Sequence, residues 1–245
     1  MEKSCDTLFD GELHCVQHLG GYRFSIDPVL LAHFVRLTQD ENVLDLGAGC
    51  GVIGLILLYR ARQRIQMLTA FELQAGLIER VRENIRINQF QEQMRVVGGD
   101  LKHIKQFLDP ESFSSVVCNP PFYPVGSGRS SSNKEAEIAR HQVACTITEV
   151  IAAAAMVVKN RGKVSLIYPA EGIGTLLPLL VKHQLTVKRM QLVYSYPDSS
   201  VEARLVLLET IKNGGEGVSV LPPFYIYNQK NGVYSEAMQQ FYEPN

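Results

Sequence analysis

The sequence predicts an α/β fold with a mostly parallel seven-stranded sheet, helices on both faces of the sheet, and an antiparallel strand late in the chain. Short apolar segments alternate with helical patterns from residue 42 onwards, as expected for successive βαβ units. The first segment runs into a glycine-rich turn that opens a helix, and the second ends at an acidic residue. Both features are typical of doubly wound sheets that bind nucleotide-like ligands.

The first strand ends in an Asp-x-Gly-x-Gly-x-Gly turn, made of Asp45, Gly47, Gly49 and Gly51. The glycines let the backbone approach a ligand closely, and the helix that follows presents unpaired N–H groups. A carboxylate aimed at this turn would repel a pyrophosphate and attract a cation. S-adenosylmethionine carries a sulfonium and an ammonium group, so it fits better than a dinucleotide. A purely structural turn is the weaker alternative, because strand, carboxylate, spacing and helix all agree.

Two more acidic residues follow the next strands. Glu72 ends the second strand, where a carboxylate is placed to bind ribose hydroxyls. Asp100 follows the third strand, where its carboxylate is expected to accept a hydrogen bond from the adenine amino group of the cofactor. Leu101, the next residue, is also expected to contact the cofactor. Alternatively, Asp100 caps the helix that begins at Leu101, and the two roles are compatible.

The fourth strand ends in Asn119, Pro120, Pro121 and Phe122. The prolines cannot continue a ladder of hydrogen bonds, so Asn119 lies on stiff backbone at the end of a strand. The amide oxygen can accept a hydrogen bond from a flat group that bears an NH2, and the amide NH2 can donate one to it. The aromatic ring of Phe122 follows close by in the sequence. The plain alternative is a strand followed by a Pro-Pro turn. First and fourth strands are neighbours in this topology, so Asn119 and the glycine turn should open into one crevice.

This constellation resembles the class I S-adenosylmethionine-dependent methyltransferases, and its Asn-Pro-Pro-aromatic turn resembles their amino-methyltransferase branch. That branch modifies exocyclic NH2 groups of nucleic-acid bases, or glutamine amides in proteins. The resemblance implies that Asn119 and a backbone carbonyl of Pro120-Pro121 accept hydrogen bonds from the target nitrogen. It also implies that the ring of Phe122 stacks on the flat substrate.

Three segments extend the resemblance to the bacterial tRNA(Val) adenine-N6-methyltransferase family: residues 21–32, 43–55 and 139–141. The match runs from about residue 17 to residue 209 and implies methylation of the adenosine on the 3′ side of the anticodon. Most of that family has Tyr after Pro-Pro, whereas this chain has Phe122. Asn-Pro-Pro-Phe is also typical of enzymes that methylate guanine N2 in ribosomal RNA, so the identity of the ring leaves both bases open.

Basic residues around this site are candidates for RNA contacts. A polar loop, rich in small residues, follows Phe122 and carries Arg129 and Lys134, with Arg140 and His141 soon after it. A loop this long inside a compact domain is more often functional than not, although an ordinary solvent loop is the alternative. A helix is predicted to start after Arg23, with Asp27 as its N-cap and Pro28 as its first residue. The Gly-Gly-Tyr-Arg-Phe segment that contains Arg23 could equally line a pocket or pack as an aromatic plug at the edge of the domain.

Composition limits the other classes of function. The net charge of −1 disfavours non-specific coating of nucleic acid but allows a local RNA site. Five cysteines without C-x-x-C spacing suggest neither a disulfide framework nor a metal site, and Cys50, Cys118 and Cys145 are expected as packing residues in a reducing compartment. No signal-peptide core or membrane-length apolar run is present, which predicts a cytoplasmic protein without a membrane partner. The oligomeric state stays open.

The whole chain, 1–245, is expected to form one methyltransferase domain. Residues 1–20 form a short extension with a hairpin around Asp10-Gly11, and residues 212–245 form a tail with a second hairpin around Asn231-Gly232. The tail suggests no function.

Three alternatives accompany adenine-N6 methylation of tRNA. Guanine-N2 methylation of ribosomal RNA and methylation of protein glutamine use the same parts. Glutamine enzymes of this branch usually carry a helical N-terminal domain, and the roughly twenty residues before Gly21 are too few for one. A non-enzymatic S-adenosylmethionine-binding domain that interacts with RNA is disfavoured by the intact Asn119-Pro120-Pro121 turn.

Overall fold

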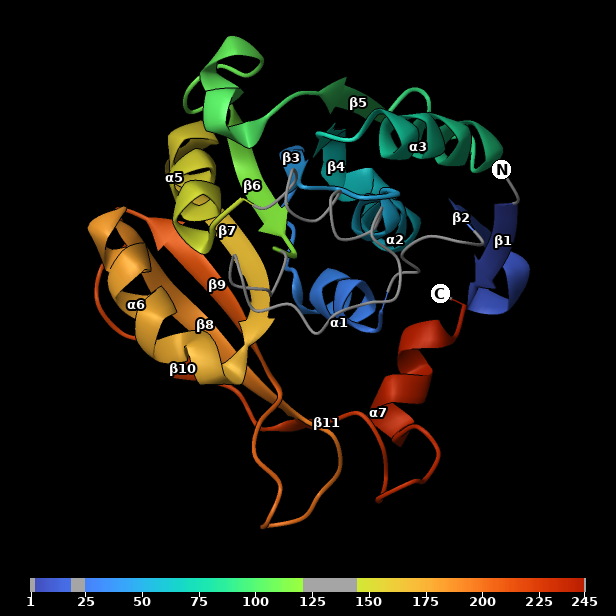
Figure 1. The fold of residues 1–245 in the computed structure, drawn as a ribbon, viewed down its shortest axis with the longest axis vertical. Coiled ribbons are helices and arrows are strands. Elements are labelled where there is room, and N and C mark those ends of the chain that lie inside the picture. Colours follow the sequence, from blue (N-terminus) through green and yellow to red (C-terminus); the bar gives the residue numbers. More distant parts are fainter. Residues whose placement is uncertain (1–2, 19–24, 121–144, 245) are drawn as a thin grey trace, which may run out of the picture.

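The computed structural model describes residues 3–18, 25–120 and 145–244. One central sheet has the order β10-β8-β9-β7-β6-β3-β4-β5, and β11 also pairs with β8 (Figure 1). Its strands are β3 (Glu41–Leu46), β4 (Ile65–Glu72), β5 (Met94–Gly98), β6 (Phe113–Cys118), β7 (Val158–Pro169), β8 (Leu185–Tyr194), β9 (Leu205–Lys212), β10 (Ser219–Val220) and β11 (Phe224–Tyr225). Strands β3 to β7 pair in parallel, and β9 runs antiparallel between β7 and β8. The seven long strands confirm the expected sheet, and β10 and β11 extend it by two residues each.

Helices cover both faces of this sheet (Figure 1). One face carries α1 (Asp27–Phe34), α2 (Val52–Ala61) and α3 (Ala75–Ile87), and the other carries α5 (Ile147–Val157), α6 (Ile173–Lys182) and the 3-10 helix η3 (Leu101–Gln106). Successive strand residues alternate between two buried clusters, because their side chains point to opposite faces. In β3, Val43 packs on the α1–α3 side and Leu44 packs on the α5–α6 side.

The start of α1 corrects one detail of the prediction. Asp27 is the first helical residue and not the N-cap, so Pro28 occupies the second position. The helix starts early because Ile26 already has helical backbone angles and its carbonyl accepts the N–H of Leu30 at 3.0 Å. Ser25 Oγ accepts the N–H of Asp27 at 3.4 Å, and Ile26, the N-cap residue, makes no side-chain cap bond.

The N-terminal hairpin is confirmed and lies beside α2 and α3 (Figure 1). It pairs β1 (Lys3–Leu8) with β2 (Leu13–His18) through the turn η1 (Phe9–Gly11). Leu13 and Cys15 of β2 are buried in the same cluster as α2 and α3. The hairpin therefore belongs to the layer of α1–α3 and contributes to its core.

The C-terminal tail folds back onto the same layer. Strands β10 and β11 run parallel to β8, and the short helices α7 (Glu236–Gln239) and η5 (Gln240–Tyr242) follow them. Ile226 and Met238 are buried in the core cluster. The predicted turn at Asn231-Gly232 is confirmed by an antiparallel bridge between Tyr227 and Tyr234.

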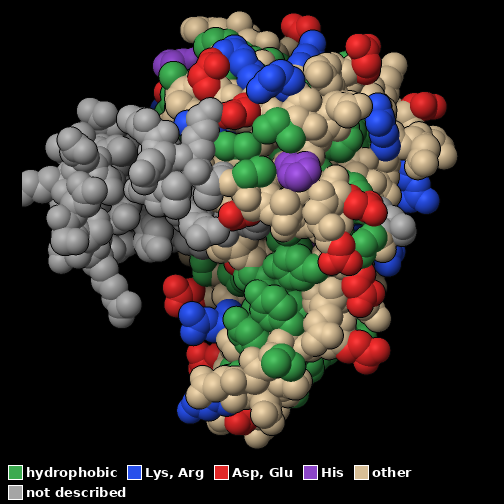
Figure 2. Space-filling view, turned by 90° about the vertical axis from the view of Figure 1, so that its right-hand side faces the viewer, with side chains coloured by type: hydrophobic (Ala, Val, Ile, Leu, Met, Phe, Trp, Pro, Cys, Tyr) green, Lys and Arg blue, Asp and Glu red, His purple; other side chains and the backbone are tan. Residues whose placement is uncertain are grey.

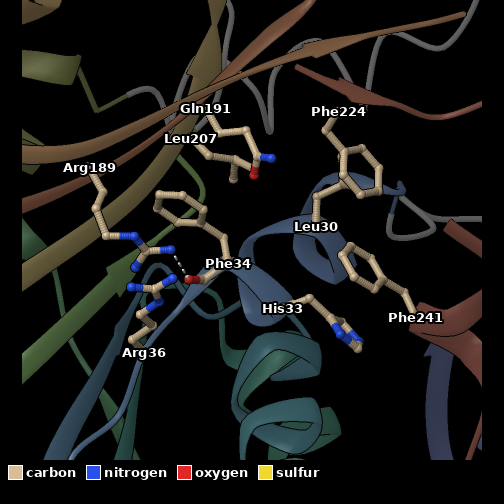
Figure 3. Close-up of a pocket in the computed structure, with 9 residues that line it drawn as sticks. All are labelled: Leu30, His33, Phe34, Arg36, Arg189, Gln191, Leu207, Phe224 and Phe241. Carbon is tan, nitrogen blue, oxygen red and sulfur yellow. Dashed lines mark hydrogen bonds between the residues drawn. The ribbon is translucent and has the colours of Figure 1, made fainter. Parts of the chain in front are cut away.

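A small cavity of about 170 Å³ remains between α1, β8 and the tail. Figure 3 shows its lining, where His33 lies against Phe241 and the Arg189 guanidinium reaches the backbone oxygen of Phe34. Figure 2 shows hydrophobic side chains gathered low on the face that it presents, at the level of the tail, with charges of both signs around them. Among the described residues, no helix is both long and apolar enough to cross a membrane.

Candidate cofactor and catalytic site

The carboxyl ends of β3, β4 and β6 bring three of the predicted residues to one edge of the sheet. Asp45 of β3 pairs with Ala70 of β4 and with Val117 of β6. Glu72 ends β4, and Asn119 follows β6 directly. These three residues therefore lie at the carboxyl ends of neighbouring parallel strands, at one edge of the sheet.

The turn after β3 has the backbone that its glycines predict. Gly47, Gly49 and Gly51 all have positive φ angles, of +76°, +59° and +85°. A Cβ atom at Gly47 or Gly49 would meet no described residue within 4 Å, whereas one at Gly51 would lie 3.3 Å from the methyl group of Met94. As far as the described residues go, the first two glycines leave room for a ligand to approach the backbone, and the third packs against the core.

Asp45 lies behind this turn and not on its open side. Its side chain is fully buried, and Oδ2 accepts the N–H of Gly54 in the first turn of α2 at 3.3 Å. The other oxygen, Oδ1, is buried without a hydrogen-bond partner among the described residues. Burial raises the pKa of Asp45 to about 7, the negative charge of Glu72 adds to the shift, and the bond from Gly54 opposes it.

Glu72 ties the end of β4 to the turn. Its Oε2 accepts the N–H of Gly49 at 2.9 Å, and its Oε1 accepts the N–H groups of Leu73 and Gln74, both at 2.9 Å. Burial raises its pKa, and these three hydrogen bonds counteract the effect. Since each carboxylate oxygen has two lone pairs, Oε2 keeps one that can accept a hydroxyl.

Asp100 lies one strand further along the same edge. Its Oδ1 accepts the N–H of Lys102 at 2.9 Å, which confirms the predicted cap of η3. The N–H of Gly99 donates to the backbone oxygen of Glu72 at 3.0 Å, so this segment is fixed next to the end of β4. Leu101 begins η3 and is half-buried.

Asn119 presents an amide at the end of β6. Its Oδ1 is buried and has no hydrogen-bond partner among the described residues, and Pro120 after it is buried. A buried acceptor without a partner costs free energy, so it indicates a group that is satisfied by a ligand. The remaining predicted residues lie outside the described part of the chain: Pro121, Phe122, Arg23, Arg129, Lys134, Arg140 and His141.

These features fit S-adenosylmethionine. Among the described residues, space is free beside the backbone of Gly47 and Gly49, an unpaired acceptor lies at Asn119, and the carboxylates Glu72 and Asp100 stand along the same edge. Residues 26–170 match the model of the methyltransferase small domain, which is more than half of the chain. The chain belongs to this family.

Relatives of this methyltransferase cover almost its whole length. A protein from Shewanella loihica, named tRNA1(Val) (adenine(37)-N6)-methyltransferase, is 28% identical over 237 residues, which cover 94% of this chain and 93% of the relative. Relatives with the same name from Phocaeicola vulgatus and Haemophilus influenzae are 28% and 25% identical. The first match covers 74% of each protein, and the second covers 88% of this chain and 96% of the relative.

Solved structures show the same fold. A crystal structure from Agrobacterium tumefaciens, described as a predicted O-methyltransferase, aligns with a TM-score of 0.70 at 18% identity, covering 88% of this chain and 94% of that chain. TYW2 from Pyrococcus horikoshii aligns with a TM-score of 0.59 at 15% identity, covering 86% of this chain and 72% of that chain. The protein is therefore a class I methyltransferase, and its cofactor is S-adenosylmethionine.

Asn84 of α3 is a residue of the methyltransferase site region that the sequence patterns did not single out. It is fully buried, and its Nδ2 donates to the backbone oxygen of Cys50 in the glycine turn at 2.9 Å. Its Oδ1 accepts the N–H of Val16 in β2 at 2.7 Å. The available signal was a pair of asparagines, Asn84 and Asn88, four residues apart next to the apolar stripe of a helix.

Proposed function

We propose that this enzyme methylates the exocyclic N6 of an adenosine in tRNA, on the 3′ side of the anticodon. The observation that carries the proposal is Asn119 Oδ1, a buried acceptor without a partner among the described residues, next to the glycine turn. Such an acceptor suits the N–H of an amine that is to be methylated. Two relatives whose alignments cover more than nine-tenths of this chain are named tRNA adenine-N6 methyltransferases, and their names support the choice of adenine and of tRNA.

The chain's own groups position an amine and polarise it. An exocyclic amine is a weak nucleophile, because its lone pair is delocalised into the ring. Hydrogen bonds from its N–H groups to Asn119 Oδ1 and to the carbonyl of Pro120 turn this lone pair out of the ring plane. Positioning and preorganised acceptors then lower the barrier without a general base. Stacking on Phe122 holds the base in the plane that these bonds require.

Other residues of the same edge hold the cofactor, which supplies a methyl group bound to a positively charged sulfur. Gly47 and Gly49 border its amino-acid end with bare backbone, and the free lone pair of Glu72 accepts a ribose hydroxyl. Asp100 and Leu101 lie where the adenine ring would be held. Asp45 fixes the turn from behind through Gly54.

Basic residues that the sequence brings close to the site residues along the chain serve the RNA in this proposal. Arg23, Arg129, Lys134, Arg140 and His141 would pair with phosphates of the anticodon stem-loop. Reversing the charges of Arg129 and Lys134 should raise the KM for tRNA and leave cofactor affinity unchanged. The same reversal at Lys159 and Arg161, near the start of β7 at the opposite edge of the sheet, is the matched control.

The decisive experiment identifies the methylated nucleoside. The protein is incubated with methyl-labelled cofactor and, separately, with unmodified tRNA, the same tRNA with guanosine in place of the adenosine 3′ to the anticodon, ribosomal RNA, DNA and bulk protein. After digestion, N6-methyladenosine from the first tRNA alone is expected. N2-methylguanosine would assign the guanine reaction, methylglutamine would assign the protein reaction, and cofactor binding without any transfer would favour a non-enzymatic RNA-interaction domain.

A further inference from the structure

Two cysteines meet where the N-terminal hairpin touches the glycine turn. The sulfur of Cys15 on β2 lies 3.8 Å from the sulfur of Cys50, which stands between Gly49 and Gly51. Cys15 is completely buried, whereas Cys50 is partly exposed. The sequence predicted Cys50 as a packing residue, yet the structure pairs it with a second thiol from a distant segment.

The surroundings of the two thiols shift their pKa values in opposite directions. Cys50 precedes the N-terminus of α2, and its pKa is lowered by the hydrogen bond from Cys15 and by the backbone N–H groups of Val52 and of Cys50 itself, against the effects of burial and of Asp45. The pKa of Cys15 is raised, first by its bond to Cys50 and then by burial. Cys50 is therefore the less buried of the two cysteines, and its place just before a helix N-terminus favours a thiolate there.

We propose that Cys15 and Cys50 form an oxidation site that reacts with small hydroperoxides and closes to an intramolecular disulfide, which weakens cofactor binding. This geometry has the two parts that a redox-sensitive pair requires: a partly exposed cysteine just before a helix N-terminus, and a second thiol 3.8 Å away. The effect on the cofactor rests on the proposed contact between the cofactor and the glycine turn.

The chemistry balances with one molecule of hydrogen peroxide. The Cys50 thiolate attacks one peroxide oxygen, the S–O bond forms as the O–O bond breaks, and the leaving hydroxide takes a proton to become water. Cys15 sulfur then attacks the sulfur of the Cys50 sulfenic acid, and the hydroxide that leaves takes the Cys15 proton. Two thiols and one peroxide thus yield one disulfide and two waters.

In this proposal, closing the disulfide displaces the turn. A disulfide places the two sulfurs about 2.0 Å apart, well short of the 3.8 Å separation in the reduced pair. Cys15 is held in a buried strand, so Cys50 is the sulfur that moves. Its backbone oxygen is bonded to Asn84, and the neighbouring Gly49 is bonded to Glu72. A shift of Cys50 therefore reaches the part of the turn that borders the open space.

The test uses the purified full-length protein, reduced or treated with equimolar hydrogen peroxide. Alkylation and intact-mass measurement should show two protected thiols and a loss of two hydrogens, and a peptide map should join Cys15 to Cys50. Calorimetry should show about tenfold weaker cofactor binding, or 1.4 kcal/mol, fully restored by a thiol reductant. The Cys5→Ser variant, altered at an exposed cysteine, should behave like the wild type.

Other outcomes separate the parts of this proposal. In Cys15→Ser, peroxide should leave a dimedone-reactive sulfenic acid at Cys50 and no disulfide. If all thiols stay reactive after peroxide treatment, or if a disulfide joins other cysteines, the proposed oxidation site is wrong. A Cys15–Cys50 disulfide with unchanged cofactor affinity would overturn its effect on binding. A reduced protein that binds cofactor but methylates no adenosine would contradict the proposed function and leave this inference standing.

Discussion

At the scale of single residues, the site consists of carboxyl and amide oxygens that differ in what they bind. Both oxygens of Glu72 accept backbone N–H groups, so this residue shapes the turn before any ligand is present. Asp45 and Asn119 each keep one buried oxygen without a partner among the described residues. Because an unsatisfied buried acceptor is costly, the Asn119 oxygen at the end of β6 is the point at which binding or chemistry can recover free energy, whereas Asp45 lies behind the turn.

Asn119 should therefore matter for the reaction and little for the cofactor. Asn119→Ala removes the acceptor that we propose for the target amine, so kcat should fall by at least about a hundredfold, the scale of losing one preorganised hydrogen-bonding group. Cofactor affinity, measured by calorimetry, should change by less than about threefold, or 0.7 kcal/mol. Asn42→Ala, at the other end of β3, is the control and should leave both values unchanged. Near-normal kcat in Asn119→Ala would refute the proposed polarisation of the amine.

Asp45 should give the folded protein a measurable pH dependence. Its pKa is about 7 in the folded state and 3.8 when unperturbed, so between these values the folded state holds a proton that the unfolded state has released. The free energy of unfolding of the wild type should then fall as pH rises from about 4 to 7, by up to about 1.4 kcal/mol per pH unit relative to Asp45→Asn. Above pH 7 the difference should be constant. Urea titrations at several pH values measure it, and parallel pH profiles would contradict the assignment.

At the scale of elements, two asparagines of α3 join the hairpin to the sheet. Asn88 bonds both the N–H and the C=O of His14, and Asn84 does the same for Val16. Side-chain amides thus replace a neighbouring strand for β2, since they offer a donor and an acceptor as a backbone does. Asn84 differs from Asn88 because its amide also donates to the backbone oxygen of Cys50 in the glycine turn, at 2.9 Å, and to the sulfur of Cys15, at 3.8 Å.

This difference allows a matched comparison. Asn84→Ala and Asn88→Ala should both lower the free energy of unfolding, by about 1–3 kcal/mol for each buried backbone group left without a partner. Asn84→Ala should in addition weaken cofactor binding, because the turn loses its bond to α3. Asn88→Ala should bind the cofactor as the wild type does. Equal cofactor affinities in the two variants would show that Asn84 does not position the turn.

The sequence patterns predict where the strands end but not which hydrogen bonds the site residues make. Apolar runs that stop at Gly47, Glu72 or Asn119 mark strand ends, and parallel topology then brings these ends together. Alternation of side chains assigns a face but not the N–H that a side chain reaches, so the bonds from Gly54 to Asp45 and from Gly49 to Glu72 were not foreseen. The pairing of Cys15 with Cys50 joins segments 35 residues apart and depends on the packing of the hairpin.

At the scale of the whole molecule, the N-terminal hairpin and the C-terminal tail close the same layer of the core. Leu13 of the hairpin and Met238 of the tail belong to one buried cluster with α1 and α2. Strands β10 and β11 have two residues each, too short for any periodicity, and for this reason the sequence predicted no strand in the tail outside its hairpin. We propose that the tail and the sheet unfold together as parts of the single domain that the sequence predicts.

The side chain of Met238 tests this cooperativity. It is 0% exposed, so Met238→Ala should lower the free energy of unfolding of the whole protein by about 2–5 kcal/mol through lost burial and the cavity left behind. Val233, in the same tail, is 65% exposed, and Val233→Ala should have almost no effect. If the protein is one unit, circular dichroism and tyrosine fluorescence should report a single coincident transition, shifted as a whole in Met238→Ala. A separate early transition of the tail, with the main transition unmoved, would show that the tail is an independent appendage.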